Sequence, residues 1–422
     1  MSPTKRVAVL HPDLGIGGAE RLIVDVCMAL EGSSNVNVYT SHYDTNHCFE
    51  ETRKLSVTVV GDWLPISIFN KFYILCAFIR QLWLVIWLIW SGILKRQDLI
   101  ILDQLSYCIP LINYFKNENC KVLFYCHFPD QLLANHEGLI RNIYRKLFDF
   151  VEEWSTGKAD CIVVNSKFTK SIVEKTFKSL NDEELKVVYP CVHLDNGDDN
   201  SSIASPFIQN DASFFLSINR FERKKGIDLA IRSYHKFIGD NQVTKSTPRL
   251  IIAGGYDIRV NENIQYLQEL KQICEKFDLP FQTVTDDIKL STDMEALVFF
   301  MPNIKSQVKD SLLKFANALL YTPRYEHFGI VPIEAMKLGT LVIADTSGGP
   351  LETIKNYYID PKANWTGFNV DINDEEQWAE TLKLVISLKN ESVSENCKER
   401  VSNLFSFKAM RQNLYTVISS LD

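Results

Sequence analysis

Short, wholly apolar runs alternate with longer amphipathic stretches along most of this chain, a pattern typical of parallel sheets covered by helices. In the first half, the runs expected to be strands are RVAVLHP (6–12), NVNVYT (35–40), VTVVG (57–61), DLIILD (98–103), VLFYCHF (122–128) and CIVVNS (161–166). In the second half they are FFLSIN (214–219), RLIIAGG (249–255), ALLYTP (318–323) and LVIADT (341–346). The polar stretch NGDDNSSIASP (196–206) separates the two series and is typical of a linker. The sequence therefore predicts an α/β fold with two Rossmann-like, doubly wound domains.

The length of 422 residues fits two large domains. We expect an N-terminal domain over 1–195, a C-terminal domain over 207–400, and a final helix within 401–422 that packs back toward the N-terminal domain. The formal net charge of −7 lacks the basic excess that favours nucleic-acid binding, so no nucleic-acid partner is expected. The ten cysteines contain no C-x-x-C pair, and no D-x-D pair follows a predicted strand, so no metal site is indicated.

Residues 63–94 form an unusually apolar segment for a soluble domain. Its charge-free part, LWLVIWLIWSGIL (82–94), has 13 residues, fewer than the roughly 20 that span a bilayer. A longer span would place Arg80 in the hydrocarbon, which is costly. A buried core helix, a helix in the membrane surface and a true span all stay open. The spacing of Trp83, Trp87 and Trp90 favours the second, because it puts the three rings on one helical face. The last residues contain no apolar span, so either membrane attachment relies on 63–94 or this chain is shortened.

The loop GIGGAE (15–20) follows the first predicted strand. It fails the dinucleotide fingerprint G-x-G-x-x-G, because Glu20 occupies the third glycine position. Gly17 and Gly18 would still let a ligand approach the backbone at a helix N-terminus. A loop facing a diphosphate or an acceptor is favoured, and a tight turn without a ligand is the alternative.

The run RFERKKG (220–226) follows the strand FFLSIN and contains four cations. Open α/β sheets bind ligands at the carboxyl ends of their strands, which favours an anion site over a merely solvated charge run. Arg220 offers a planar fork and Lys225 a point charge, a combination that suits a diphosphate.

The segment YEHFGIVPIEAM (325–336) contains Pro332, which fits the first turn of a helix, so a helix is expected to start near Ile330. Its free amides would face a ligand in front of Gly329. Glu326 then lies in the preceding loop. Glu334 lies in the opening turns, where it suits hydroxyl groups such as those of a ribose. Alternatively, Glu334 only complements the helix dipole and Glu326 is a surface residue.

These motifs together resemble the retaining glycosyltransferases of family four: the E-x7-E pair (Glu326, Glu334), the R-x4-K-G motif (220–226), the glycine loop and SGGPLE (347–352). More narrowly, HPDLGIGGAERLIVDVCMAL, FYCHFPDQLL, FLSINRFERKKGIDLAI and YEHFGIVPIEAM resemble the members that assemble dolichol-linked oligosaccharides. The resemblance implies the B-type fold, with two Rossmann-like domains facing across a cleft, the N-terminal one for the acceptor and the C-terminal one for GDP-mannose. It also implies transfer of mannose to a dolichol-diphosphate-linked oligosaccharide, first in an alpha-1,3 and then in an alpha-1,6 linkage, at the cytosolic face of the endoplasmic reticulum membrane.

Residue roles follow from the same resemblance. Arg220 and Lys225 would hold the donor diphosphate, Glu334 the ribose and Glu326 the transferred sugar. His127, at the end of its strand, would lie next to that sugar. The implied donor-binding residues also include Phe328, Gly329 and Ile330, and Gly17 and Gly18 would face phosphate and acceptor.

No cofactor and no essential metal are expected, because the cationic pair would take the metal's role. The membrane surface and other mannosyltransferases of the same pathway are the further partners expected. The alternatives are a family-four enzyme with another donor or acceptor, and an inactive scaffold of a membrane glycosylation complex. A nucleotide-sugar epimerase or a phosphorylase would share the fold, but neither needs the apolar segment.

Overall fold

The computed structural model describes residues 4–421 apart from 70, 134–138, 181–182, 195–212, 240–243, 245, 285–294 and 389–390. The chain divides into two compact units, residues 1–191 with 407–422 and residues 192–406. The expected linker, and the expected boundaries at 195 and 207, lie outside the described residues. The last helix of the first unit, α15 (Phe407–Ser419), begins later than the expected 401, because α14 (Glu391–Leu404) continues within the second unit.

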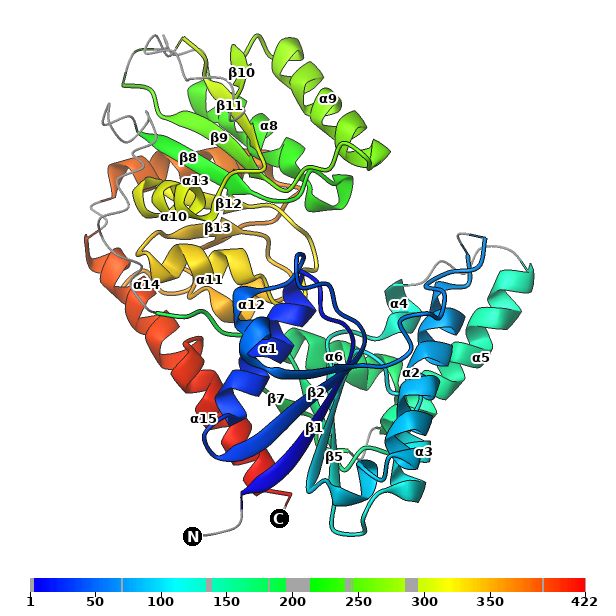
Figure 1. Ribbon diagram of the computed structural model, residues 1–422. Coiled ribbons are helices and arrows are strands. Elements are labelled where there is room, and N and C mark those ends of the chain that lie inside the picture. The colour runs from blue at the N-terminus through cyan, green and yellow to red at the C-terminus, as the bar shows by residue number, and fades with distance from the viewer. Residues whose placement is uncertain are drawn as a thin grey trace. The chain divides into compact units, whose positions relative to one another are not determined.

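The first unit is built on a seven-stranded sheet in the order β3-β2-β1-β4-β5-β6-β7, with parallel pairing throughout (Figure 1). Its strands are β1 (Lys5–Asp13), β2 (Ser34–His42), β3 (Ser56–Val59), β4 (Leu99–Asp103), β5 (Lys121–Cys126), β6 (Cys161–Val164) and β7 (Lys186–Val187). Its helices, besides α15, are α1 (Gly18–Leu30), α2 (Tyr73–Trp90), α3 (Ile109–Phe115), α4 (Asp130–Leu133), α5 (Leu139–Thr156) and α6 (Lys167–Thr176), with 3-10 turns η1 (Glu50–Lys54), η2 (Leu94–Arg96) and η3 (Lys178–Leu180).

Strand β1 shows why the runs are apolar throughout instead of alternating. Val7 and Val9 pack with α1 and α15 on one face, and Ala8 and Leu10 pack with α2 and α3 on the other. Figure 1 shows these helices on opposite sides of the sheet. A sheet buried on both faces needs apolar side chains at every position, which is the pattern expected of parallel sheets.

The second unit has its own seven-stranded parallel sheet, in the order β10-β11-β9-β8-β12-β13-β14. Its strands are β8 (Phe214–Ile218), β9 (Arg249–Gly254), β10 (Phe281–Thr283), β11 (Val298–Pro302), β12 (Ala318–Tyr321), β13 (Val342–Ala344) and β14 (Gly367–Asn369). Its helices, besides α14, are α8 (Ile227–Ile238), α9 (Asn261–Lys276), α10 (Ser306–Phe315), α11 (Ile330–Lys337), α12 (Pro350–Thr353) and α13 (Glu375–Ser387), with the 3-10 turn η4 (Arg223–Lys225). The predicted pair of doubly wound parallel sheets is confirmed.

The apolar segment 63–94 contributes α2, whose Leu84, Val85 and Leu88 are buried against the first sheet. Arg80, near the middle of the helix, is 7% exposed. Its guanidinium donates to the carbonyl oxygen of Ser41 at 2.8 Å and to that of Leu64 at 3.3 Å. Backbone carbonyl oxygens of the same unit thus accept hydrogen bonds from the buried guanidinium of Arg80.

The other side of this segment is open to solvent. Trp63, Phe69 and Trp90 are 73%, 90% and 86% exposed. By length and composition α2 is apolar enough to cross a membrane, although 33% of its 18-residue window is buried. Trp83, Trp87 and Trp90 do not share one exposed face as expected. Trp87 neighbours the buried residues of α2 and packs against the core, with its ring centroid 6.5 Å from that of Tyr39.

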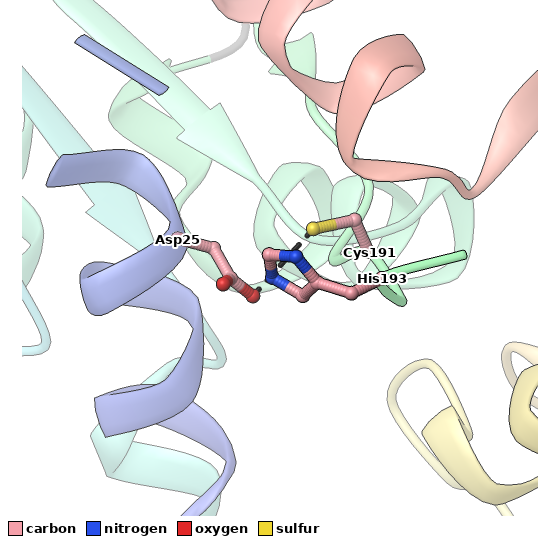
Figure 2. Close-up of side chains that lie close together, drawn as sticks. All are labelled: Asp25, Cys191 and His193. Atoms are coloured by element: carbon pink, nitrogen blue, oxygen red, sulfur yellow. Dashed lines mark hydrogen bonds between the residues drawn. The ribbon is translucent and has the colours of Figure 1, made fainter. Parts of the chain in front are cut away.

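Cys191 ties the segment after β7 to α1. Its thiol donates to Oδ2 of Asp25 at 3.5 Å, as Figure 2 shows; the figure also draws His193, two residues further along the chain. Burial, and next the charge of Asp25, raise the pKa of Cys191, so the thiol stays protonated. Arg21 pairs with the same carboxylate at 2.7 Å, which compensates the buried charge of Asp25.

Candidate active site

Lys225 and Glu326 bring together two of the residues expected to bind the donor. Lys225 ends η4, which follows β8, and Glu326 lies in the loop between β12 and α11. Nζ of Lys225 lies 2.6 Å from Oε2 of Glu326, and both side chains are largely buried. Burial raises the pKa of Glu326, but the charge and the hydrogen bond of Lys225 outweigh burial and hold the pKa below its usual value. The second sheet therefore carries an ion pair at its carboxyl edge.

The other cations of the run 220–226 have different partners. Arg223 donates to Glu269 of α9 at 3.1 Å, whereas Arg220 and Lys224 each lie 3.1 Å from Glu222. The Arg220 side chain is 63% exposed and is free to turn toward a ligand. The four cations of 220–226 thus have different carboxylate partners, and the run is not simply a solvated stretch of charge.

The loop in front of α11 is shaped by glycines. α11 starts at Ile330 as predicted, with Gly329 as its N-cap at φ +83, and no side chain caps its first amides. Gly348, at φ +71, lies against this loop, because a Cβ there would be 2.4 Å from the carbonyl oxygen of Glu326. A Cβ at Gly349 would be 2.4 Å from the carbonyl oxygen of Phe328. The backbone amide of Gly349 donates to the backbone carbonyl oxygen of Glu326 at 2.7 Å. The backbone of SGGPLE therefore holds the Glu326 loop in place.

Glu334 has a separate partner. Nζ of Lys309, on α10, lies 2.8 Å from Oε1 of Glu334, and each side chain is 27% exposed. Phe328 is buried and its ring packs edge-on against that of Phe405 at 5.8 Å, so only its backbone is suited to face a ligand. Ile330 lies at the surface. Three of the expected donor residues, Lys225, Glu326 and Glu334, thus lie in two separate ion pairs.

In the first unit, Gly17 is the N-cap of α1 and Gly18 is its first residue. The carboxylate of Glu20 folds back over this loop, since a Cβ at Gly17 would be 2.2 Å from Oε2 of Glu20. Nothing lies within 4 Å of a Cβ built at Gly18. Glu20, which breaks the dinucleotide fingerprint, thus lies beside Gly17 while the space beside Gly18 is open, and the expectation that this loop faces phosphate or acceptor stays a prediction.

Asp103 connects two histidines at the carboxyl edge of the first sheet. This wholly buried carboxylate ends β4; its Oδ1 lies 2.6 Å from Nε2 of His127 and its Oδ2 lies 2.7 Å from Nδ1 of His11. Nε2 of His11 in turn lies 3.8 Å from Oε1 of Glu20. The chain of side chains therefore runs from the glycine loop to His127.

The charges in this chain are fixed by their neighbours. Burial lowers the pKa of His11, but the hydrogen bond to Asp103 and the contact with Glu20 outweigh burial and raise the pKa to about 9. Burial raises the pKa of Asp103, but the charge of His127 and the hydrogen bonds from both histidines outweigh burial and lower the pKa to about 2. Near neutral pH, an imidazolium therefore lies between two carboxylates.

Sequence reasoning missed Asp103, His11, Glu20 and Lys309 as members of these sites. Asp103 and His11 close the predicted strands DLIILD and RVAVLHP, so their position at the carboxyl ends was a signal that could have found them. Lys309 carries no such signal, because it lies on a helix far from Glu334 in the sequence.

Two family comparisons define the class of this protein. Residues 16–196 match the family described as Glycosyltransferase Family 4, and residues 198–403 match Glycosyl transferases group 1. The fold agrees with solved structures: the chain superposes with a TM-score of 0.71 on sucrose-phosphate synthase from Thermosynechococcus elongatus, at 18% identity and covering 99% of both chains. It superposes with a TM-score of 0.66 on HepE from Anabaena, at 16% identity and covering 99% of this chain and all of that one. The protein is therefore a glycosyltransferase with two Rossmann-like domains.

Curated relatives narrow the class. The chain is 46% identical over 97% of its length to the alpha-1,3/1,6-mannosyltransferase ALG2 of Debaryomyces hansenii, covering 90% of that protein. It is 44% identical to ALG2 of Candida albicans and 39% identical to ALG2 of Dictyostelium discoideum, covering 98% of both chains in each case. The chain belongs to the family of ALG2 alpha-1,3/1,6-mannosyltransferases.

Proposed function

We propose that this chain transfers mannose from GDP-mannose to a dolichol-diphosphate-linked oligosaccharide, forming an alpha-1,3 and then an alpha-1,6 linkage. The mannosyl group and the two linkages follow the relatives. The observation that supports a diphosphate donor is the Lys225–Glu326 ion pair, which lies at a strand exit next to the loop that enters α11.

The donor would rearrange this pair. Glu326 compensates the charge of Lys225 when no donor is bound, and a diphosphate would take the lysine ammonium from it. The released carboxylate can then accept hydrogen bonds from hydroxyl groups of the mannose. Arg220 and the uncapped amides of α11 would complete the anion site, together with the backbone of 328–330. Glu334, held by Lys309, would accept the ribose hydroxyls.

The reaction would retain configuration, since both GDP-mannose and the product carry mannose in an alpha linkage. Among the described site residues, Glu326 is paired with Lys225, Glu334 with Lys309 and Asp103 with two histidines, so none of these carboxylates is proposed as a nucleophile. Departure of the diphosphate and attack of the acceptor hydroxyl on the same face is the favoured route. Charge on the departing diphosphate grows in the transition state, where Lys225, Arg220 and the helix N-terminus would stabilise it. His127 would lie beside the sugar, with its ring orientation fixed by Asp103.

The place of action would be the cytosolic face of the endoplasmic reticulum membrane. The exposed aromatic residues of 63–94 support a surface contact with the bilayer, since Trp favours the headgroup level. Other mannosyltransferases of the same pathway are the candidate protein partners.

The test is transfer by the purified protein, with GDP-mannose or UDP-glucose as donor and a lipid-diphosphate chitobiose that carries one mannose as acceptor. The expected product contains two added mannoses, and linkage analysis assigns one to an alpha-1,3 and one to an alpha-1,6 bond. Transfer from UDP-glucose alone, or a product with beta linkages, would refute the proposal.

A further inference from the structure

A pocket of about 220 Å³ lies in the first unit, beside the ends of β1 and β2 and the first half of α2. Leu10, Tyr73 and Ala77 supply apolar lining, and His11, Asp13 and Gln81 supply polar groups. Pockets for drug-sized ligands are larger, at about 300–1,000 Å³. This pocket therefore fits one part of a ligand, about the size of a single ring.

Two of the lining residues keep a buried polar atom without a hydrogen-bond partner among the described residues. The amide of Gln81, 6% exposed, donates from Nε2 to the carbonyl of Leu105 at 2.8 Å, but its Oε1 has no donor. Nε2 of His11 lies 3.8 Å from Glu20, which is too long for a hydrogen bond. Gln81 Oε1 thus lacks a hydrogen-bond partner at this pocket, and His11 Nε2 has only the longer ion-pair contact with Glu20, so a ligand that supplies hydrogen bonds can relieve a costly state.

A sugar ring matches this combination of groups. Each sugar hydroxyl can donate and accept, as Gln81 Oε1 and His11 Nε2 together require, and the carboxylate of Asp13 adds an acceptor. The C–H face of the ring would lie on the apolar lining and on the ring of Tyr73. The pocket is also linked to His127, which is proposed to lie beside the transferred sugar, because His11 and His127 share the carboxylate of Asp103.

We infer that this pocket is a subsite for the acceptor glycan and holds the sugar next to the mannose that receives the new linkage. The inference rests on the proposed function. An isoprenoid chain fits less well, since it would leave the unpartnered atoms of Gln81 and His11 without hydrogen bonds.

The decisive variant is Ala77→Leu, which fills the pocket without removing a polar group. Tyr73→Ala removes the aromatic lining, and Tyr114→Ala on α3, where the side chain is 81% exposed, is the matched control. KM is measured for two acceptors, the mannosyl-chitobiose lipid diphosphate and a lipid diphosphate that carries mannose alone, each with a short and a long lipid. Thermal melting and the Kd of GDP-mannose show whether the fold and the donor site are intact.

The wild type should prefer the acceptor with the longer glycan, and Ala77→Leu should raise KM for it about tenfold, with little change for the one that carries mannose alone. Tyr73→Ala should act in the same direction and Tyr114→Ala should have no effect. Folded variants that keep the wild-type preference would overturn the inference. So would a KM that responds to the length of the lipid instead of the glycan, because the pocket would then hold the lipid.

A direct binding measurement separates this inference from the proposed function. Free mannosyl-chitobiose should bind the wild type and bind Ala77→Leu at least tenfold more weakly. Absence of transfer by the wild type, with this difference in binding present, would refute the proposed reaction but keep the subsite. Transfer by the wild type with equal binding to both proteins would refute the subsite alone.

Discussion

Lys225 and Glu326 lie 2.6 Å apart as an ion pair although 101 positions separate them, because β8 and β12 are neighbours in the second sheet. The cation proposed to bind the diphosphate is thus partnered by the carboxylate proposed to bind the sugar. The pair would need to separate when the donor binds.

Lys225→Ala should lower kcat by more than it raises KM, because the lost charge matters most as the diphosphate departs. The expected loss is about 30- to 1,000-fold in kcat/KM, or ~2–4 kcal/mol. The control is Lys224→Ala, whose side chain is 68% exposed and which should stay close to wild type. Equal, wild-type-like kinetics of two folded variants would show that the donor diphosphate binds elsewhere.

Glu334→Gln should weaken GDP binding about 10- to 100-fold, since charge-assisted hydrogen bonds to the ribose would be lost. Lys309→Met should weaken it in the same direction but less, because the carboxylate stays and only its orientation is released. Calorimetric titration with GDP measures both. Lys314→Met, on the same helix, is the control, and a Lys309→Met protein that binds GDP like Lys314→Met would rule out this role of Lys309.

His11 should make the fold less stable as the pH rises. Its pKa of about 9 in the folded protein exceeds the ordinary value of 6.5, so its stabilisation is complete below about pH 6.5 and is lost as the pH rises through 9. The loss should be on the order of 3 kcal/mol in the free energy of unfolding. Denaturant unfolding at several pH values should show this fall for the wild type and for His42→Gln but not for His11→Gln. A parallel fall in all three proteins would assign the pH dependence to other groups.

Activity should survive EDTA, because Lys225, Arg220 and the N-terminus of α11 would supply the positive charge that a metal provides in other transferases. The rate is measured before and after chelation and again after Mg²⁺ or Mn²⁺ is added. Complete loss in EDTA with recovery on adding a divalent ion would contradict this expectation.

Residues 63–94 should bind membranes without crossing them. A span would have to pull Arg80 away from the carbonyl oxygens of Ser41 and Leu64 and place it in hydrocarbon. Cysteine labelling in sealed microsomes should report sites before 63 and after 94 on the same side. Opposite sides would mean that the segment spans, and that the first sheet is not formed as described.

The strands were predictable because burial on both faces makes each of them a wholly apolar run. All ten predicted strands are present, but β7, β10, β11 and β14 were missed. Three of these strands have only two or three residues, too few to show a pattern. The sequence of β11, VFFMP, is a wholly apolar run like those of the predicted strands, so it could have been found.

The positions of Lys225, Glu326 and His127 were predictable because a motif coincides there with the exit of a strand, whereas their roles in binding stay predictions. The partners of those residues were not predictable. Asp103 looks like the end of a strand in the sequence, and its two histidines become its partners only when β1, β4 and β5 lie side by side. The Lys309–Glu334 pair likewise depends on how α10 and α11 pack.

The close approach of Gly348 to the backbone of Glu326 has a consequence for how variants of this protein should be read. Any side chain at Gly348 would overlap the backbone of Glu326 and shift the loop that carries its carboxylate, so a screen of random substitutions should score this glycine as harshly as a residue of the site. Inherited changes at Gly348 or Gly349 should lower turnover although neither glycine takes part in the chemistry, and because both are buried against backbone they should lower protein abundance as well.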